Sequence, residues 1–337
     1  MKGGDNVKND YKGIWVFAEQ ESGKLHPTVL ELLAKSKELQ KHNGEKITAV
    51  LLGAGVSGLT ETLFAYGADA VLLAEDEALR SYSARPYQQA LTQLVEKYRP
   101  AILLYGATPL GRDLAPRVMV ALDTGLTADA IDLGFDEDGV FYQTTPGYGG
   151  KILAHIVILE RRPQMATVHP QICAPLEPVH GVSGELIVEH PAVRADADYE
   201  VLESVPTEKS GEPLTEARVV VAGGRGVKTA EELALLRELA DLLDGQLASS
   251  RPLVDNGMLP HDRQIGQSGA TITPELMFNI AISGSVQYQL GMQKAKCIVA
   301  VNQSEDAPIY DIAHIGAVTD YKKLLPALIA EIKARKA

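Results

Sequence analysis

The chain has 337 residues, of which 45% are hydrophobic, and its formal net charge is −12 at pH 7. A chain of this length can bury two ordinary hydrophobic cores, so we expect a soluble protein of two globular domains. The acidic balance provides no basic stripe of the kind that nucleic acids or anionic membranes require, which argues against both partners.

Strand and helix patterns alternate along the first 122 residues. Short apolar runs predict strands and amphipathic stretches predict helices. In chain order these are strand 14–18, helix 27–41, strand 47–52, helix 56–66, strand 70–74, helix 86–98, strand 101–105 and helix 110–122. This alternation predicts a mostly parallel sheet with helices on both faces.

The pattern changes after residue 128. The turn sequence D-E-D-G at 136–139 predicts a hairpin, and residues 140–144, 151–159 and 164–168 are predicted strands, so we expect an antiparallel portion to close this domain. Residues 194–216 are rich in Asp, Glu, Pro, Ser and Gly, which predicts an edge strand that passes into a linker. We therefore place an N-terminal α/β domain at 1–205 and the linker at 206–217.

A second α/β unit is predicted at 218–337. Its strands are expected at 218–222, 246–250, 276–282 and 297–301, and its last helix is expected to begin near Asp320. Thr229 and Glu232 have the spacing of a capping box, and Gly245 lies where that helix should have its C-terminal cap. The expected fold of this unit is a doubly wound sheet.

The cysteines and histidines indicate neither cross-links nor metal. Cys173 and Cys297 lie far apart and form no C-x-x-C pair, so they support neither a disulfide framework nor an iron–sulfur cluster. The eight histidines show no metal-ligand spacing. The N-terminus is polar and no later apolar run reaches membrane-spanning length. We expect a cytoplasmic protein without membrane insertion and without a metal site.

A glycine-rich fingerprint lies in the first domain. The sequence G-A-G-V-S-G at 53–58 matches the dinucleotide-binding pattern after a strand, and Glu75 lies close to the expected acidic position. Taken alone, it indicates an NAD-dependent dehydrogenase. The fingerprint normally follows the first strand of the sheet, whereas here strand 14–18 and a full helix precede it. We favour a structural turn, and no proton-transfer residue for a dehydrogenase can be identified.

A second phosphate-binding pattern lies near the C-terminus. The apolar run 276–282 is followed at once by Ser283 and Gly284 and then by residues that can continue as a short helix. At such a junction the first helix amides have no internal partners and suit a phosphate. Upstream, Gln267, Ser268 and Gly269 supply an amide, a hydroxyl and a flexible backbone, which suit a heteroaromatic ring.

The turn at 223–226, G-G-R-G, is expected at the same edge of the second sheet. Glycine in such a turn often serves the backbone alone. Because the carboxyl ends of the strands are where open α/β sheets bind ligands, we favour a functional turn in which Arg225 contacts a pyrophosphate or an adenosine.

Six short motifs occur in the order found in the alpha subunit of electron transfer flavoproteins. They are V-A-G-G-R-G at 221–226, S-R at 250–251, G-Q-S-G at 266–269, P-E-L at 274–276, S-G-x-x-Q at 283–287 and A-V-N at 300–302. Residues 113–117, 124–129 and 162–168 resemble the N-terminal domain of the same family, so the likeness covers nearly the whole chain. Two positions depart from the family pattern: Tyr288 stands where members usually have histidine, and Ser268 stands where many have threonine.

The resemblance implies that FAD is bound mainly by the second domain. It places Arg251 against the flavin ring, where a positive charge favours the reduced, negatively charged ring, and it adds Ser268 and Tyr288 as residues that tune the flavin. The implied cofactor-binding residues are Arg225, Ser250, Arg251, Ile265, Gly266, Gln267, Ser268, Gly269, Ser283, Gly284, Ser285, Val286, Gln287, Tyr288, Asn302 and Asp320.

The resemblance also implies an electron carrier rather than a stand-alone enzyme. Its first domain would contact a beta subunit in a heterodimer, and the complex would exchange electrons with an acyl-CoA dehydrogenase or a related dehydrogenase. Flavin-based electron bifurcation with NADH and ferredoxin or flavodoxin is implied if the beta subunit carries a second FAD, which this chain does not decide. Two alternatives stay open: an NAD-dependent dehydrogenase that uses residues 53–58, and a non-redox scaffold that has lost the flavin.

Overall fold

The computed structural model describes residues 10–147, 152–198, 201–203 and 212–336. The chain divides into two compact units, Met1–Ser204 and Val205–Ala337. Residues 206–211 of the predicted linker at 206–217 lie outside the described residues, and its other half contains a short 3₁₀ helix, η4 (Leu214–Glu216). Among the described residues, no helix is both long and apolar enough to cross a membrane.

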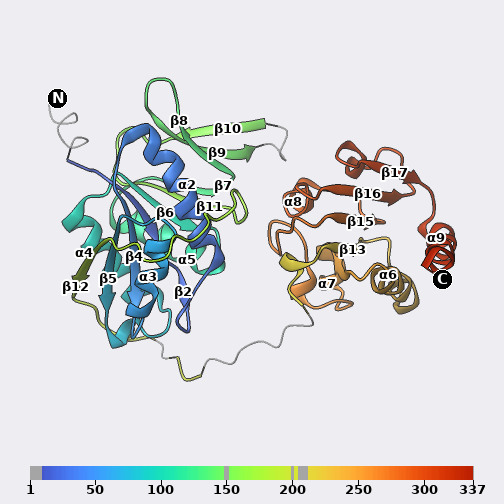
Figure 1. The fold of residues 1–337 in the computed structure, drawn as a ribbon, viewed down its shortest axis with the longest axis horizontal. Coiled ribbons are helices and arrows are strands. Elements are labelled where there is room, and N and C mark those ends of the chain that lie inside the picture. Colours follow the sequence, from blue (N-terminus) through green and yellow to red (C-terminus); the bar gives the residue numbers. More distant parts are fainter. Residues whose placement is uncertain (1–9, 148–151, 199–200, 204–211, 337) are drawn as a thin grey trace. The chain divides into compact units, whose positions relative to one another are not determined.

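Seven strands form a parallel sheet in the described part of the first unit (Figure 1). Their order across the sheet is β12-β5-β4-β1-β6-β11-β7, and every neighbouring pair is parallel. The predicted parallel sheet is therefore confirmed. The strands are β1 (Ile14–Phe17), β4 (Ile47–Gly53), β5 (Ala70–Glu75), β6 (Ile102–Gly106), β7 (Leu126–Ala130), β11 (Gln164–Val168) and β12 (Glu185–Glu189).

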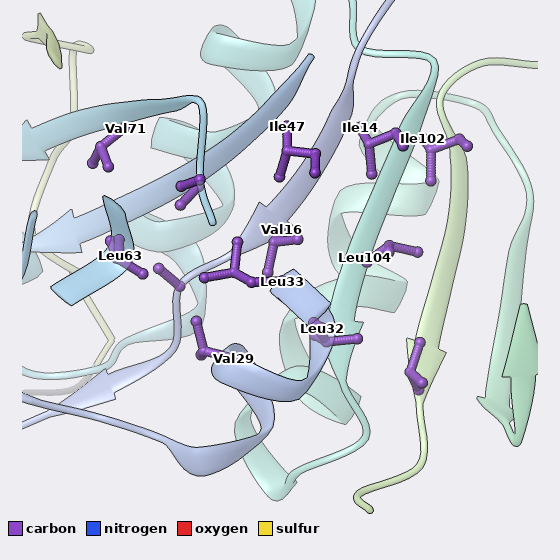
Figure 2. Close-up of a cluster of buried hydrophobic side chains, with 14 of the residues drawn as sticks. Ile14, Val16, Val29, Leu32, Leu33, Ile47, Leu63, Val71, Ile102 and Leu104 are labelled. Atoms are coloured by element: carbon purple, nitrogen blue, oxygen red, sulfur yellow. The ribbon is translucent and has the colours of Figure 1, made fainter. Parts of the chain in front are cut away.

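Helices cover both faces of this sheet, and its central strands are therefore buried on both sides. One core cluster joins the strands to α2 (Pro27–Asn43) and α3 (Thr60–Ala65), as Figure 2 shows. A second cluster joins the other face to α4 (Ala84–Tyr98) and α5 (Pro109–Ala121). The predicted helix at 56–66 is shorter in the structure, because its first turn is a 3₁₀ helix, η1 (Ser57–Leu59).

Two predictions at the end of the first unit were wrong. The predicted strand at 164–168 belongs to the parallel sheet, between β6 and β7, and not to the antiparallel portion. The predicted antiparallel portion itself is confirmed: its sheet contains β9 (Phe141–Gly147) and β10 (Ile152–Val157), where strands 140–144 and 151–159 were predicted, together with β8 (Asp132–Phe135), which was not predicted. The edge strand expected after residue 194 lies earlier, as β12, which pairs with β5. Pairing with distant strands decided these positions, and the local pattern does not encode it.

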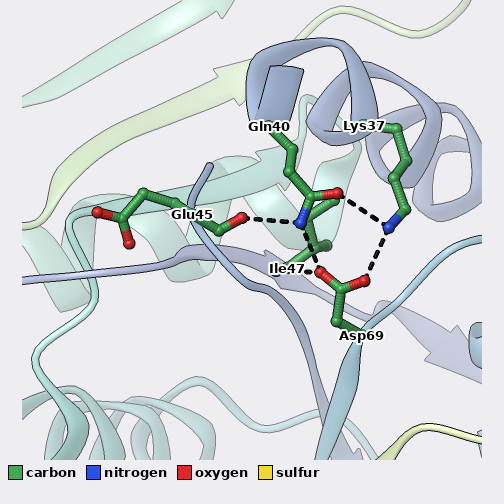
Figure 3. Close-up of polar contacts among 5 residues, drawn as sticks. All are labelled: Lys37, Gln40, Glu45, Ile47 and Asp69. Carbon is green, nitrogen blue, oxygen red and sulfur yellow. Dashed lines mark hydrogen bonds and ion pairs between the residues drawn. The ribbon is translucent and has the colours of Figure 1, made fainter. Parts of the chain in front are cut away.

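A polar network holds α2 against the starts of β4 and β5 (Figure 3). The two carboxylate oxygens of Asp69 accept hydrogen bonds from Lys37 Nζ at 2.8 Å, Gln40 Nε2 at 2.7 Å and the Ile47 amide at 2.9 Å. Gln40 also donates to the Glu45 carbonyl at 2.9 Å. The C-terminal half of one helix is thereby fixed to the strand that follows it and to the next strand of the sheet.

In the described part of the second unit, five parallel strands run in the order β14-β13-β15-β16-β17. They are β13 (Val219–Gly223), β14 (Gln246–Ser249), β15 (Leu276–Ile280), β16 (Cys297–Asn302) and β17 (Ile315–Val318). Helices α6 (Ala230–Leu242) and α9 (Tyr321–Lys336) share one core cluster, and α8 (Val286–Gln289) lies against the other. The doubly wound sheet is confirmed, with β17 as a strand that was not predicted.

The caps of α6 agree only in part with the prediction. Thr229 Oγ1 accepts from the Glu232 amide at 3.3 Å, which is one half of the predicted capping box, whereas the Glu232 carboxylate accepts from the Lys228 amide at 2.7 Å. At the other end, however, Asp244 and not Gly245 takes the left-handed conformation, with φ of 54°. A Cβ at Gly245 would lie 2.7 Å from the Val219 carbonyl oxygen, so this glycine allows the chain to pass close to the start of β13.

The remaining short elements connect these layers. They are β2 (Gln20–Glu21), β3 (Lys24–Leu25), η2 (Glu77–Leu79), η4 (Leu214–Glu216), α7 (Arg251–Asp255), η5 (His261–Arg263) and η6 (Pro308–Asp311).

Candidate functional site

The strands β13 to β16 end at one level of the second sheet. Gly223 pairs with Ser249 on one side and with Ile280 on the other, and Ile280 pairs with Val301. Backbone bonds join the segments that follow: the Gly224 amide donates to the Ile280 carbonyl at 2.9 Å. The turns that carry most of the predicted binding residues therefore meet at the carboxyl edge of the sheet, which is where open α/β sheets bind ligands.

Residues 281–285, called the anion loop below, turn sharply after β15. Ala281 and Gly284 both have positive φ, at 55° and 82°. The loop follows the predicted strand 276–282, which ends two residues early, at Ile280. The amides of Ser283, Gly284 and Ser285 donate to no acceptor among the described residues.

Three donors hold the carbonyl groups of the anion loop. Asn302 Nδ2 donates to the Ile282 carbonyl at 2.8 Å, and the Ile309 amide donates to the Ser283 carbonyl at 3.0 Å. Gln289 Nε2 donates to the Gly284 carbonyl at 2.9 Å. In a planar trans peptide the carbonyl and the next N–H point in opposite directions, so each bond also fixes the direction of one free amide. Three successive amides are thereby held in fixed directions without an acceptor among the described residues, so they are available to an anion.

The glycines of this edge allow close packing of backbone. A Cβ at Gly284 would lie 2.4 Å from the Ile309 amide nitrogen, and a Cβ at Gly224 would lie 2.1 Å from the Ala281 carbonyl oxygen. We expected Gly284 to admit a phosphate. The structure adds a second requirement, because any side chain here would also collide with η6.

The loop at 264–270 lies next to α8, the short helix that follows the anion loop. The Gln267 amide donates to the Gln287 carbonyl at 2.8 Å, and Gly266 has φ of 131°. Ser268 is exposed, and its Oγ accepts from Gln264 Nε2 at 2.9 Å, so the hydroxyl hydrogen of Ser268 is available to a ligand. A Cβ at Gly269 would lie 2.4 Å from the Gln264 carbonyl oxygen, so this position leaves no room for a side chain.

Two arginines provide positive charge at this edge. Arg225 is exposed in the turn after β13. The predicted strand 246–250 ends one residue early, at Ser249, and Arg251 begins α7, with Ser250 at the N-cap position. Its side chain is 69% exposed and pairs with Asp255 at 3.3 Å, which is a weak surface ion pair. Neither guanidinium is buried, so both can turn towards an anionic ligand.

Tyr288 faces the core of the second unit. It is 4% exposed, and its hydroxyl donates to Asn279 Oδ1 at 2.6 Å. Burial raises the pKa of the Tyr288 phenol well above its usual value. Asn279 in turn donates to the Val299 carbonyl at 3.2 Å. The side chain thus connects α8 to β15 and β16, and this geometry gives its hydroxyl no path to a ligand.

The other predicted residues divide into exposed and bracing groups. Ser285 and Gln287 are exposed and Val286 is half-buried, whereas Ile265 is buried and presents only its backbone. The side-chain amide of Asn302 donates to the Ile282 carbonyl. The Asp320 carboxylate accepts from the Lys322 amide at 2.9 Å, at the start of α9. Gln289 and Ile309 were not predicted from the sequence. Both hold carbonyls of the anion loop through contacts that form in the folded chain and that no local sequence pattern indicates.

The fingerprint at 53–58 is filled by the protein itself. Glu75 Oε1 accepts from the amides of Val56 at 2.6 Å and Ser57 at 3.2 Å, which are groups that a bound phosphate would need. A Cβ at Gly53 would lie 2.6 Å from a methyl group of Val56. The acidic residue that made the motif attractive therefore stabilises a turn, and the geometry favours the structural reading.

The residues at the carboxyl edge of the second sheet fit FAD. Oriented amides suit its pyrophosphate, a serine hydroxyl suits its ring nitrogens, and exposed guanidinium groups suit its negative charges. Among the described residues there is no cluster of three or more His, Cys, Asp or Glu side chains able to hold a metal ion.

Comparisons with known proteins point in the same direction. Residues 14–198 match the model of the "Electron transfer flavoprotein domain", and residues 213–293 match that of the "Electron transfer flavoprotein FAD-binding domain". The chain is 40% identical to the electron transfer flavoprotein subunit alpha of Thermoanaerobacterium thermosaccharolyticum, over 97% of this chain and 100% of that protein. It is 42% identical to the subunit of the same name from Clostridium acetobutylicum, over 97% and 98%. It is 44% identical to protein FixB of Bradyrhizobium diazoefficiens, over 96% and 89%.

Proposed function

Because the chain belongs to the electron transfer flavoprotein alpha subunit family, we propose that it pairs with a beta subunit and passes electrons between an acyl-CoA or related dehydrogenase and a second redox partner. It is an FAD-binding electron transfer protein, and FAD when bound supplies a ring that accepts and releases electrons. Bifurcation with NADH and ferredoxin or flavodoxin is the finer alternative, and it requires a second FAD in the beta subunit.

The observation that carries this proposal is the anion loop. In this loop the amides of Ser283, Gly284 and Ser285 donate to no acceptor among the described residues. The three carbonyls that precede these amides already accept hydrogen bonds from other groups of the second unit, so each amide points away from such a bond. Such preorganised donors bind a diphosphate without further ordering of the backbone. In the fingerprint at 53–58, two backbone amides already donate to Glu75, so they are not available to the phosphates of NAD. This weakens the case for an NAD-dependent dehydrogenase.

The name "subunit alpha" of the relatives and an exposed apolar strand support the heterodimer. The antiparallel sheet of the first unit ends at β10, whose outer edge pairs with no other strand among the described residues. Four of its apolar side chains are 38–59% exposed, on both faces of the strand: Ile152, Leu153, Ile156 and Val157. An uncovered edge with apolar side chains is a liability unless a partner covers it. We infer that the beta subunit covers β10.

The cofactor site is tested with the co-expressed heterodimer. We expect Gly284→Val to lose FAD, because the new side chain collides with Ile309 and disturbs the oriented amides. Gly257→Val is the matched control: Gly257 has φ of 70° but no atom within 4 Å of its Cβ position, so the variant adds backbone strain without the collision. FAD is counted from the absorption spectrum, and circular dichroism confirms folding. Near-stoichiometric FAD in folded Gly284→Val would overturn the site.

The same measurement on the wild-type heterodimer separates the functions. One FAD per heterodimer supports a simple carrier, and two support bifurcation. Colourless protein that binds NAD would support a dehydrogenase, and colourless protein that binds neither cofactor would support a scaffold.

A further inference from the structure

Gln289 connects the anion loop to η6 through one side-chain amide. Its Nε2 donates to the Gly284 carbonyl at 2.9 Å and to the Pro308 carbonyl at 3.2 Å. A primary amide has two hydrogens, so it satisfies both carbonyls at once. Gln289 is half-buried, lies five residues beyond one acceptor and nineteen before the other, and so bridges segments that are separate in the chain.

The bridge lies beside a second contact between the same segments. The Ile309 amide donates to the Ser283 carbonyl at 3.0 Å, and the Gly284 backbone packs against Ile309. The two acceptors on the anion loop are consecutive carbonyls, one held by backbone and one by Gln289. Gly284 has no Cβ to restrict its dihedral angles, so the peptides on both sides of it rotate more easily than their neighbours. The Ile309 amide holds the first of them and Gln289 holds the second, between Gly284 and Ser285.

We propose that Gln289 is a positioning residue for the FAD pyrophosphate, a role that rests on the proposed function of the anion loop. By holding the Gly284 carbonyl away from the ligand, it directs the Ser285 amide towards the ligand, because both groups belong to one peptide plane. Rotation of that peptide would replace a donor with a carbonyl dipole facing the phosphate. Gln289 thus determines whether the third amide attracts or repels the cofactor, although its own side chain touches the loop from behind.

The test uses the heterodimer with FAD removed and added back. Gln289→Met keeps the length of the side chain and removes both donors. We expect it to raise the Kd for FAD about tenfold, as the loss of two hydrogen bonds and an unoriented amide implies. Gln293→Met is the matched control: Gln293 is exposed and lies four residues further on, so its Kd should equal that of the wild type.

A second variant distinguishes orientation from packing. Gln289→Glu places a carboxylate against two carbonyls at pH 7.5, and FAD should bind more weakly than in Gln289→Met. As the pH falls to about 5.5, the introduced carboxyl gains a proton, can donate to one carbonyl, and FAD affinity should recover relative to wild type. Gln289→Met should show no such recovery. This pH profile also serves if Gln289→Met fails to fold.

The outcomes separate the two proposals. If the wild-type heterodimer binds no FAD, the proposed function fails. If the wild type binds FAD and both Gln289 variants bind it equally well at every pH, the function stands and the positioning role is wrong. Weaker binding in both variants without pH recovery in Gln289→Glu would also overturn it, because packing alone would then explain the loss.

Discussion

At the scale of single residues, the positive charge of Arg251 at the carboxyl edge of the second sheet is paired with a nearby carboxylate. Arg251 and Asp255 lie four residues apart and pair at 3.3 Å, both largely exposed. A fixed positive charge near a ring that has gained an electron lowers its free energy without reorganisation during transfer. The carboxylate of Asp255 offsets part of that charge.

We expect Arg251→Ala to lower the first reduction potential of the bound flavin. Each tenfold change in preference for the reduced form shifts a one-electron couple by about 59 mV, and the loss of Arg251 should reach at least that order. Ser268→Ala removes an uncharged donor and should shift the potential less. Asp255→Asn should shift it in the opposite direction, and Arg251→Lys should stay near wild type. Spectroelectrochemistry measures all four; shifts within error, with FAD still bound, would show that the ring lies elsewhere.

Tyr288 stands where members of the family usually have histidine, and in this structure it is part of the core. Its hydroxyl donates to Asn279, which is completely buried in β15. Tyr288→Phe would leave the Asn279 oxygen without its donor, and we expect a loss of about 1–3 kcal/mol in the free energy of unfolding. Urea denaturation followed by flavin release measures the loss. A shift in reduction potential with unchanged stability would instead show that the hydroxyl tunes the flavin.

At the scale of elements, the carboxylate of Asp69 acts as a joint between a helix and two strands. Burial alone would raise its pKa, but hydrogen bonds from Lys37, the Ile47 amide and Gln40 outweigh burial, so the pKa of Asp69 is lowered. A lowered pKa means that the folded state holds its proton less tightly than the unfolded chain. The joint therefore stabilises the first unit at neutral pH and weakens in acid.

Asp69→Asn should destabilise the first unit by about 1–2 kcal/mol at pH 7, a modest value because the side chain is 33% exposed. The difference from wild type should be constant above the unfolded-state pKa near 4. It should shrink as the pH falls through the lower folded-state pKa, where wild-type Asp69 also becomes neutral. Asp138→Asn, in an exposed turn, is the control. Unfolding midpoints across pH decide the matter; a difference that does not vary with pH would contradict the assignment.

At the scale of the whole molecule, the exposed strand β10 bears on assembly. Stable heterodimers bury apolar surface on the scale of roughly 2,000 Å² or more, and Leu153 is 59% exposed in the chain alone. Expressed without its partner, the chain should be poorly soluble or lose flavin. A stable, flavin-saturated monomer by light scattering would contradict the heterodimer.

Leu153→Asp should weaken the heterodimer, raising its Kd about tenfold or more, because a carboxylate would have to be buried in the interface. Val120→Asp is the matched control, because Val120 is also an exposed apolar residue, at 72%, but belongs to α5 and not to the antiparallel sheet that contains β10. Size-exclusion chromatography with light scattering measures both. Equal heterodimer in the two variants would show that the beta subunit binds elsewhere.

The amino-acid sequence by itself determined the class of fold and the location of the site. Alternating strand and helix patterns follow from local side-chain periodicity, so the parallel sheets and the Thr229 cap were predicted correctly. Short motifs at the ends of strands indicated a phosphate site in the second unit, because residues that bind at a strand end are close in sequence to that strand. Their resemblance to the alpha subunits of electron transfer flavoproteins indicated FAD as the ligand, and the FAD-binding model matches residues 213–293.

Only the tertiary structure decided which groups remain free for a ligand. The sequence offers two candidate phosphate-binding turns, yet Glu75 accepts from amides of the turn at 53–58. In the anion loop, by contrast, Asn302, Ile309 and Gln289 hold the carbonyls, and the amides of residues 283–285 have no acceptor among the described residues. Likewise, Asn279 draws the Tyr288 hydroxyl into the core, and β11 enters the parallel sheet by pairing with β6 and β7. In each case the partner lies five or more residues away or on another strand, so the hydrogen bond exists only once the chain has folded.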